Sequence, residues 1–170
     1  MKTTSRFALT ALAALTLAST VSAAQNSATT SANANARIIA PITLVKTVDL
    51  NFGDVVPGAS IGTVVVAPGG ARTSAGGATL GSATGVTAAA FTVGGLANAT
   101  YSITLPAAPI TITGPTSTMT VDTFTSSPTP TGTIGAGGTQ TLNVGATLNV
   151  GVAQAVGAYT GTFSVTVAYN

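Results

Sequence analysis

The sequence predicts an all-β fold, an antiparallel β-sandwich with almost no helix after the N-terminus. Apolar and polar residues alternate in short runs that are separated by Gly, Pro and Asn, the pattern of strands and tight turns. We count about seven or eight such runs, which suits a sandwich with crossing connections. Only 5% of the 170 residues are charged and Glu is absent, a composition that disfavours exposed helices. The length suits one domain.

Residues 1–23 are expected to be a secretory signal peptide. Lys2 and Arg6 lie at the start, residues 7–21 are uncharged and rich in Ala and Leu, and Val21-Ser22-Ala23 is a small-residue cleavage site. Charge, apolar core and cleavage site follow one another as they do in exported proteins. We therefore expect cleavage after Ala23 and export of the rest.

Removal of this segment leaves a neutral chain. The remaining charged residues are Arg37, Lys46, Arg72, Asp49, Asp54 and Asp122. Equal numbers of both signs give no basis for binding nucleic acid. With no Cys, the exported chain has neither disulfides nor a thiol nucleophile.

Residues 24–40 form an N-terminal extension. Its first part, residues 24–35, has no large apolar side chain and is not expected to order by itself. From Ala32 onward small apolar residues alternate with polar ones, and Pro41 then forces an edge or a bend. The alternating positions are Ala34, Ala36, Ile38 and Ala40. They are either a strand donated to another copy or the ordinary first strand of residues 41–170, the predicted sandwich domain.

Extended segments are expected in order along residues 42–105. Residues 42–52 and 63–66 read as strands, and the Gly-rich stretch that follows, through Gly85, reads as loops and short edge strands. Apolar residues alternate in residues 89–93 and again in residues 101–105, and a short loop joins the two runs. This pattern predicts a hairpin.

Two further short strands are expected at residues 110–112 and 119–121. The alternation slips at Phe124, which predicts a bulge near Asp122. Residues 126–138 read as a loop. Residues 142–150 then alternate as the penultimate strand, and their repeated Leu-Asn-Val-Gly is better explained by one strand face than by a solenoid.

Residues 158–170 carry the most regular alternation in the chain. It predicts a half-buried strand over the whole segment. The residues on one face of this strand are Tyr159, Gly161, Phe163, Val165, Val167 and Tyr169.

Little in the sequence suggests an enzyme. His, Cys and Glu are absent, so the usual catalytic triads and zinc ligands are excluded. Residues 49–54 offer oxygen ligands at calcium-like spacing but lack the later bidentate Glu, and a turn explains them better. We expect no catalytic residue, cofactor or metal.

The C-terminal pattern resembles that of chaperone-usher pilus subunits, which end on alternating apolar residues with a penultimate Tyr and a Gly fourteen positions from the end. Tyr169 and Gly157 occupy these places. The apolar positions between them are Tyr159, Phe163, Val165 and Val167. In that family this strand pairs with a periplasmic chaperone before assembly. The resemblance therefore implies a chaperone and an outer-membrane usher as partners.

A broader similarity covers most of the exported chain. The segments Pro41-Ile42, Leu50-Asn51-Phe52-Gly53, Ala90-Phe91-Thr92-Val93 and Gly157-Ala158-Tyr159-Thr160-Gly161 look like an uncharacterised family of exported bacterial domains, similar in plan to spore-coat-U-like pilins. This implies an Ig-like sandwich that lacks one strand. Many pilins carry a disulfide, which this chain does not have.

Together these expectations describe a structural subunit of an extracellular fibre or surface layer, such as a fimbrium or pilus. It would pass through the periplasm to the cell surface and assemble with copies of itself or related subunits by strand donation. One alternative is a monomeric secreted adhesion module with the same sandwich. The other is a small outer-membrane β-barrel, which needs strands of roughly 9–11 residues, whereas most runs here are shorter.

Overall fold

The computed structural model describes residues 27–170, and the chain divides into two units, residues 1–37 and Ile38–Asn170. In the first unit, residues 27–37 are exposed and belong to no strand. The predicted signal peptide and its cleavage site at Ala23 lie outside the described residues. Within the described part of the chain, no helix is long and apolar enough to cross a membrane.

Residues 38–170 form an all-β structure of ten strands without a helix. The strands are β1 (Thr43–Val48), β2 (Val55–Val66), β3 (Arg72–Leu80), β4 (Ala89–Gly94), β5 (Thr100–Thr104), β6 (Ile110–Thr113), β7 (Thr118–Ser127), β8 (Thr131–Thr133), β9 (Thr139–Val150) and β10 (Thr166–Tyr169). Every pairing is antiparallel. The predicted antiparallel β-sandwich is therefore confirmed.

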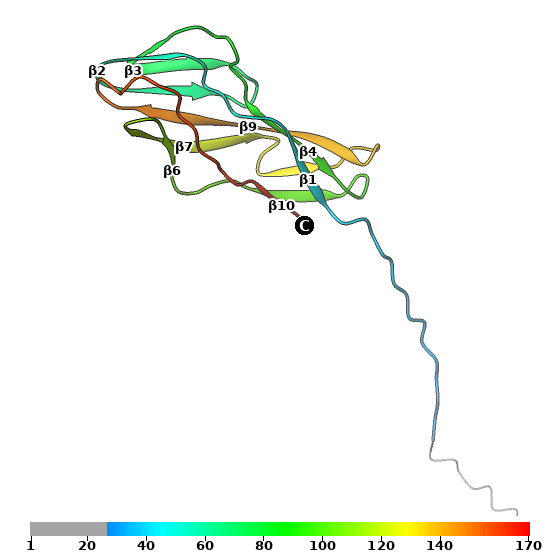
Figure 1. Ribbon diagram of the computed structural model, residues 1–170. Coiled ribbons are helices and arrows are strands. Elements are labelled where there is room, and N and C mark those ends of the chain that lie inside the picture. The colour runs from blue at the N-terminus through cyan, green and yellow to red at the C-terminus, as the bar shows by residue number, and fades with distance from the viewer. Residues whose placement is uncertain (1–26) are drawn as a thin grey trace, which may run out of the picture. The chain divides into compact units, whose positions relative to one another are not determined.

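The long strand β9 is the centre of the larger sheet (Figure 1). Its first half pairs with β4 and its second half with β2, while β7 pairs along its other edge. β1, β3 and β6 lie beyond β4, β2 and β7 respectively. The alternation expected for residues 142–150 is confirmed as one strand face. Its buried apolar side chains are Leu142, Val144, Ala146, Leu148 and Val150.

The smaller sheet, in the order β10-β5-β8, covers only part of the larger one. Its Tyr101, Ile103 and Val167 pack with a core cluster around Phe91 and Leu142. A second cluster surrounds Val64, Val121 and Leu148, and none of the residues packed against it comes from β5, β8 or β10. Half of the core thus has no second sheet above it.

The two ends of the domain can be located from its contacts. The Tyr169 hydroxyl donates to the carbonyl of Ala40 and accepts from the Leu96 amide. The chain therefore enters the domain where β4 ends and β9 begins, since Gly95 bonds to Gly138 there. The loop of residues 151–158 follows the far end of β9, and its Ala153 amide donates to the Gly58 carbonyl. The 12 residues of β9 separate these ends by about 40 Å.

Three predicted elements are wrong in their partners or extent. Residues 89–93 and 101–105 do not form a hairpin, because β4 and β5 lie in different sheets. Residues 72–80 form one nine-residue edge strand, β3, where loops and short edge strands were predicted, because their small side chains allow close pairing with β2. The expected loop of residues 126–138 includes the end of β7 and the short strand β8.

The strand expected over residues 158–170 is also shorter than predicted. Only β10, residues 166–169, pairs as a strand, with β5. The bulge predicted near Asp122 is confirmed, because the pairing of β7 with β9 shifts between Asp122 and Thr125. The strands predicted at residues 110–112 and 119–121 are present and pair with each other as β6 and β7.

Alkaline pH is expected to destabilise the domain through Tyr101. This side chain is fully buried, its hydroxyl donates to Gln140 Oε1 at 2.7 Å, and burial raises its pKa above the usual value. A raised pKa in the folded state means that its contribution is complete below about pH 10 and is lost as the pH rises through the folded value. Urea unfolding between pH 8 and pH 11.5 should show this fall, and Tyr101→Phe should flatten it. An unchanged slope in the variant would contradict the assignment.

Candidate functional site

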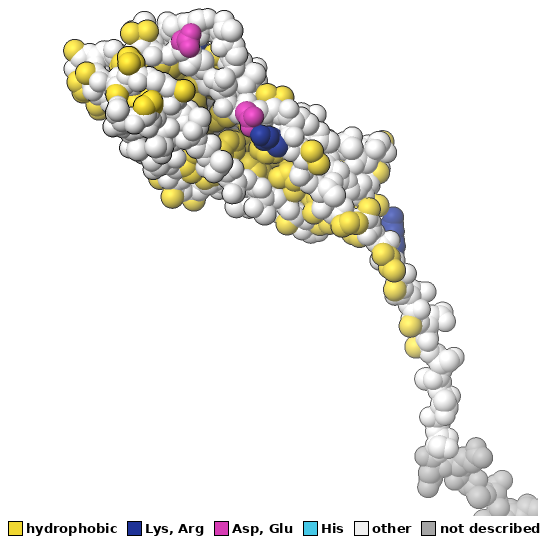
Figure 2. Space-filling view, in the orientation of Figure 1, with side chains coloured by type: hydrophobic (Ala, Val, Ile, Leu, Met, Phe, Trp, Pro, Cys, Tyr) yellow, Lys and Arg dark blue, Asp and Glu magenta, His cyan; other side chains and the backbone are white. Residues whose placement is uncertain are grey.

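An open groove of about 850 Å³ lies over the half of the core that the smaller sheet leaves uncovered. One side, the N-terminal wall, is residues 46–57; the other, the C-terminal wall, is residues 154–163. Figure 1 shows these two stretches of chain with the larger sheet behind them, and Figure 2 shows hydrophobic side chains gathered in a hollow on this face. The groove is the main candidate for a functional site.

The floor of the groove is apolar. Val121, Leu148 and Val150 from β7 and β9 are buried at its base. The surrounding side chains are only half buried: Leu50, Phe52, Ile110, Ile112 and Met119. Apolar groups that remain partly exposed gain free energy when a further apolar segment covers them.

The two walls present unpaired backbone edges. The N-terminal wall is bonded on one side, through Asn51 to Thr87 and through Val55 to Leu80. The C-terminal wall is bonded to β6 only by the bridge between Thr113 and Thr160. Among the described residues, no backbone hydrogen bond joins one wall to the other. Such edges readily accept a further strand.

Arg72 holds the N-terminal wall in place. Its guanidinium donates to the carbonyls of Phe52 at 2.8 Å, Asp54 at 3.2 Å and Gly81 at 2.9 Å. Gly53 has a φ of 68°, and a Cβ there would lie 2.6 Å from the same guanidinium. The Asn51 side chain accepts from the Gly53 amide, so the predicted turn is present. The sequence did not identify Arg72, because its partners are backbone carbonyls distant in the chain.

Tyr159 anchors the C-terminal wall. Its hydroxyl donates to the Ala155 carbonyl and accepts from Gln154 Nε2, and it also bonds to the Ser117 hydroxyl. Its ring lies against Gly114 at the turn between β6 and β7. Gly157, in the loop before it, has a φ of 148°. These contacts give Tyr159 a structural role that its place in an alternating pattern did not predict.

The other residues predicted for the assembly strand keep their alternation, although only Val167 and Tyr169 lie in a paired strand. Phe163, Val165, Val167 and Tyr169 all pack against the first core cluster. Phe163 contacts Phe91 edge-on and Phe124 with tilted rings, at centroid distances of 6.4 and 5.0 Å. Side-chain burial therefore holds this segment in place up to β10.

The candidate donor positions lie outside the sheets. Ala34, Ala36, Ile38 and Ala40 are exposed and belong to no strand, and Ile38 is 98% exposed. The alternative that residues 32–40 are the first strand of their own domain is therefore wrong, because the first strand begins at Thr43. Ala40 belongs to the second unit, where its carbonyl accepts a hydrogen bond from the Tyr169 hydroxyl.

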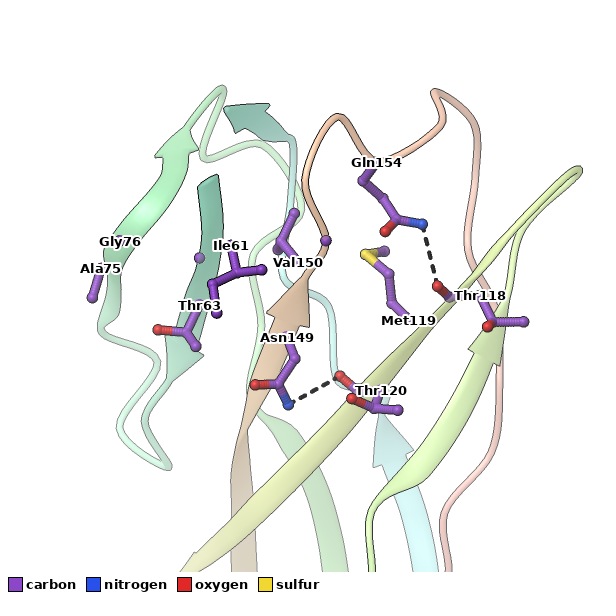
Figure 3. Close-up of a pocket in the computed structure, with 12 residues that line it drawn as sticks. Ile61, Thr63, Ala75, Gly76, Thr118, Met119, Thr120, Asn149, Val150 and Gln154 are labelled. Carbon is purple, nitrogen blue, oxygen red and sulfur yellow. Dashed lines mark hydrogen bonds between the residues drawn. The ribbon is translucent and has the colours of Figure 1, made fainter. Parts of the chain in front are cut away.

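A second hollow, of about 560 Å³, lies at the loop end of β9 and meets the groove at Met119, Val150 and Gln154. Figure 3 shows Asn149 and Gln154 turned toward the backbone of Thr120 and Thr118, to which they donate. Its lining contains no charged residue, and both amides are already bonded. The groove, with two walls over an apolar floor, therefore remains the main candidate for a functional site.

The fold and the groove define an antiparallel β-sandwich with an incompletely covered core. Comparison with known families matches residues 42–169 to the family described as Domain of unknown function (DUF4402), and the chain belongs to this family. Neither the comparison with curated proteins nor that with solved structures gives a significant match.

Proposed function

We propose that this protein is a structural subunit of an extracellular fibre or surface layer, and that copies assemble by donating a strand into the groove. The observation that carries the proposal is the pair of unpaired backbone edges facing each other above an apolar floor. An added strand would bond to these edges and place alternate side chains on the floor.

The extension of a second copy is the proposed donor. Its alternating positions are small apart from Ile38, so this isoleucine is the anchor, and none of them is used by a strand of its own domain. Burying an isoleucine contributes about 2 kcal/mol. Backbone pairing along the rest of the extension adds affinity.

Donation in this manner generates a linear assembly. The extension joins the domain at the Tyr169 end, whereas the groove runs toward Gly58 and Ala153 at the other end. Donor and acceptor surfaces therefore differ, and a heterologous contact that does not close on itself produces a filament.

The resemblance of the C-terminal segment to pilus subunits supports the cellular part of the proposal. The signal-like N-terminus would direct the chain to the periplasm. A chaperone would fill the groove there, and an usher would release the subunits to the cell surface as a fimbrium. The proposed role needs no enzymatic activity, cofactor or nucleic acid.

Ile38→Asp is the test of the proposal in the chain of residues 24–170. Loss of about 2 kcal/mol of free energy from burying the isoleucine corresponds to roughly 30-fold weaker assembly. The unpaired charge in an apolar groove weakens assembly further. Size-exclusion chromatography and electron microscopy over a range of concentrations measure the effect. Because Ile38 is exposed and outside both core clusters, the variant should fold normally.

Ile39→Asp is the matched control, since this neighbour is out of phase with the groove and should be tolerated. The Ile38→Asp protein keeps its groove, so a synthetic peptide of residues 32–44 should raise its melting temperature by mass action. A wild-type chain that stays monomeric at every concentration, together with no thermal shift at high peptide concentration, would contradict the proposal.

A further inference from the structure

Asp54 differs from the other carboxylates of the described chain. Asp49 pairs with Lys46, and Asp122 accepts from Thr123 and Asn149. Asp54 is exposed on the N-terminal wall of the groove, and among residues 27–170 no side chain bonds to its carboxylate. Arg72 holds this residue in place by donating to the Asp54 carbonyl. The Asp54 carboxylate, at the rim of an apolar groove, is therefore available to an incoming segment.

Arg37 is the charged residue of the extension. It is exposed, and its neighbours at positions 36 and 38 are the apolar residues proposed to face the floor. In an extended donor the side chain of Arg37 would therefore point up toward the rim. The domain carries Lys46 and Arg72 against three Asp, so the basic extension and the acidic domain have opposite net charge.

The geometry of a head-to-tail assembly brings these two residues together. If the Ala40 end of the donor enters at the end of the groove near Pro57, the donor runs parallel to the N-terminal wall. Arg37 lies three residues before Ala40, and Asp54 lies three residues before Pro57. The same register sets Ile38 beside Val55, which packs on the second core cluster. Over residues 54–57 of the wall, the inward and outward phases of the two segments agree.

We infer that an ion pair between Arg37 of one copy and Asp54 of the next fixes the register and direction of the donated strand. This inference rests on the proposed function, and it specifies which residues of a second copy occupy the rim of the groove. The donor would lie parallel to residues 54–57 and antiparallel to the C-terminal wall. An exposed pair adds little affinity, so its main effect is on register and specificity.

Charge reversal in the full exported chain tests the inference. Arg37→Asp and Asp54→Arg each replace the attraction with a repulsion, and each should raise the concentration for half-maximal assembly about fivefold at low salt. The double variant should return to within about twofold of the wild type. Asp122→Arg, on the bulge of β7, is the matched control and should not rescue Arg37→Asp. Salt should reduce all these differences.

Each outcome has a distinct meaning. If Asp54→Arg restores assembly of the Arg37→Asp chain and Asp49→Arg does not, the proposed register is supported. If Asp49→Arg restores it, or if neither substitution does, the register is overturned. Strand donation itself still stands in that case, provided that Ile38→Asp blocks assembly. Absence of assembly in the wild type rejects the proposed function itself. Circular dichroism shows whether Asp54→Arg disturbs folding. If it does, the neutral substitutions Asp54→Asn and Arg37→Gln, made singly and together, test the pair without introducing repulsion. Losses of assembly that simply add in the double variant would overturn the ion pair.

Discussion

Gly145→Ala is expected to destabilise the domain by about 3 kcal/mol, because no space exists for a Cβ at this position. Gly145 lies in β9 between the part that pairs with β4 and the part that pairs with β2. A Cβ there would lie 2.1 Å from the Val66 carbonyl oxygen and 2.7 Å from the Ala67 carbonyl carbon. Both are backbone atoms of the adjacent strand end, so relief requires β2 or β9 to move.

Thermal unfolding measures this effect, with an expected fall in melting temperature of about 6–12 °C for a domain of this size. Gly69→Ala is the matched control, since a Cβ there meets nothing within 4 Å. It should leave the melting temperature within a degree or two, or raise it slightly by restricting the unfolded chain. Equal stability of the two variants would show that the strands beside Gly145 are less closely packed than the structure has them.

Phe163→Asp is expected to have a still larger effect, about 4 kcal/mol, and to damage the C-terminal wall of the groove. The substitution removes aromatic contacts with Phe91 and Phe124 and places a carboxylate against the first core cluster. Urea unfolding measures the loss of stability, and assembly measurements report the groove. The variant should accept a donor poorly even though its own extension is intact.

Thr162→Asp provides the comparison for stability, because this neighbour is exposed and belongs to neither core cluster, although it also lies on the C-terminal wall. A surface substitution of this kind should change stability by no more than about 0.5 kcal/mol. Mixing experiments separate the two defects: a Phe163→Asp chain should still donate to wild-type subunits, whereas an Ile38→Asp chain should not. Comparable stability of Phe163→Asp and Thr162→Asp would mean that the alternation in this segment is not fixed by burial.

Local sequence pattern predicted several of the strands and which of their side chains face inward. The alternation of residues 142–150 became the central strand, and the phase slip at Phe124 became a bulge, because both follow from the two-residue period of a strand. The same period placed Phe163, Val165 and Val167 inward even where the backbone is not paired. Burial of alternate side chains is a local property and can be predicted from the sequence.

Pairing partners were decided by tertiary structure. Ala89–Gly94 and Thr100–Thr104 look like a hairpin, yet β4 bonds to β1 and β9 while β5 bonds to β10 and β8. The turn between them is present, with Asn98 at a φ of 62°, but it carries the chain from one sheet to the other. A turn signal specifies a change of direction and does not specify which edge the next strand joins.

The groove is likewise a tertiary feature. The sequence supplied Leu50, Phe52 and the alternating C-terminal residues as strand faces, and the resemblance implied a sandwich that lacks one strand, but the pattern did not show which segments would line the open part of the core. That arrangement arises because the smaller sheet is too short to cover the second half of β9. The sequence by itself determined an all-β chain with a weakly apolar extension, and only the packing of two unequal sheets decided where the core would stay open.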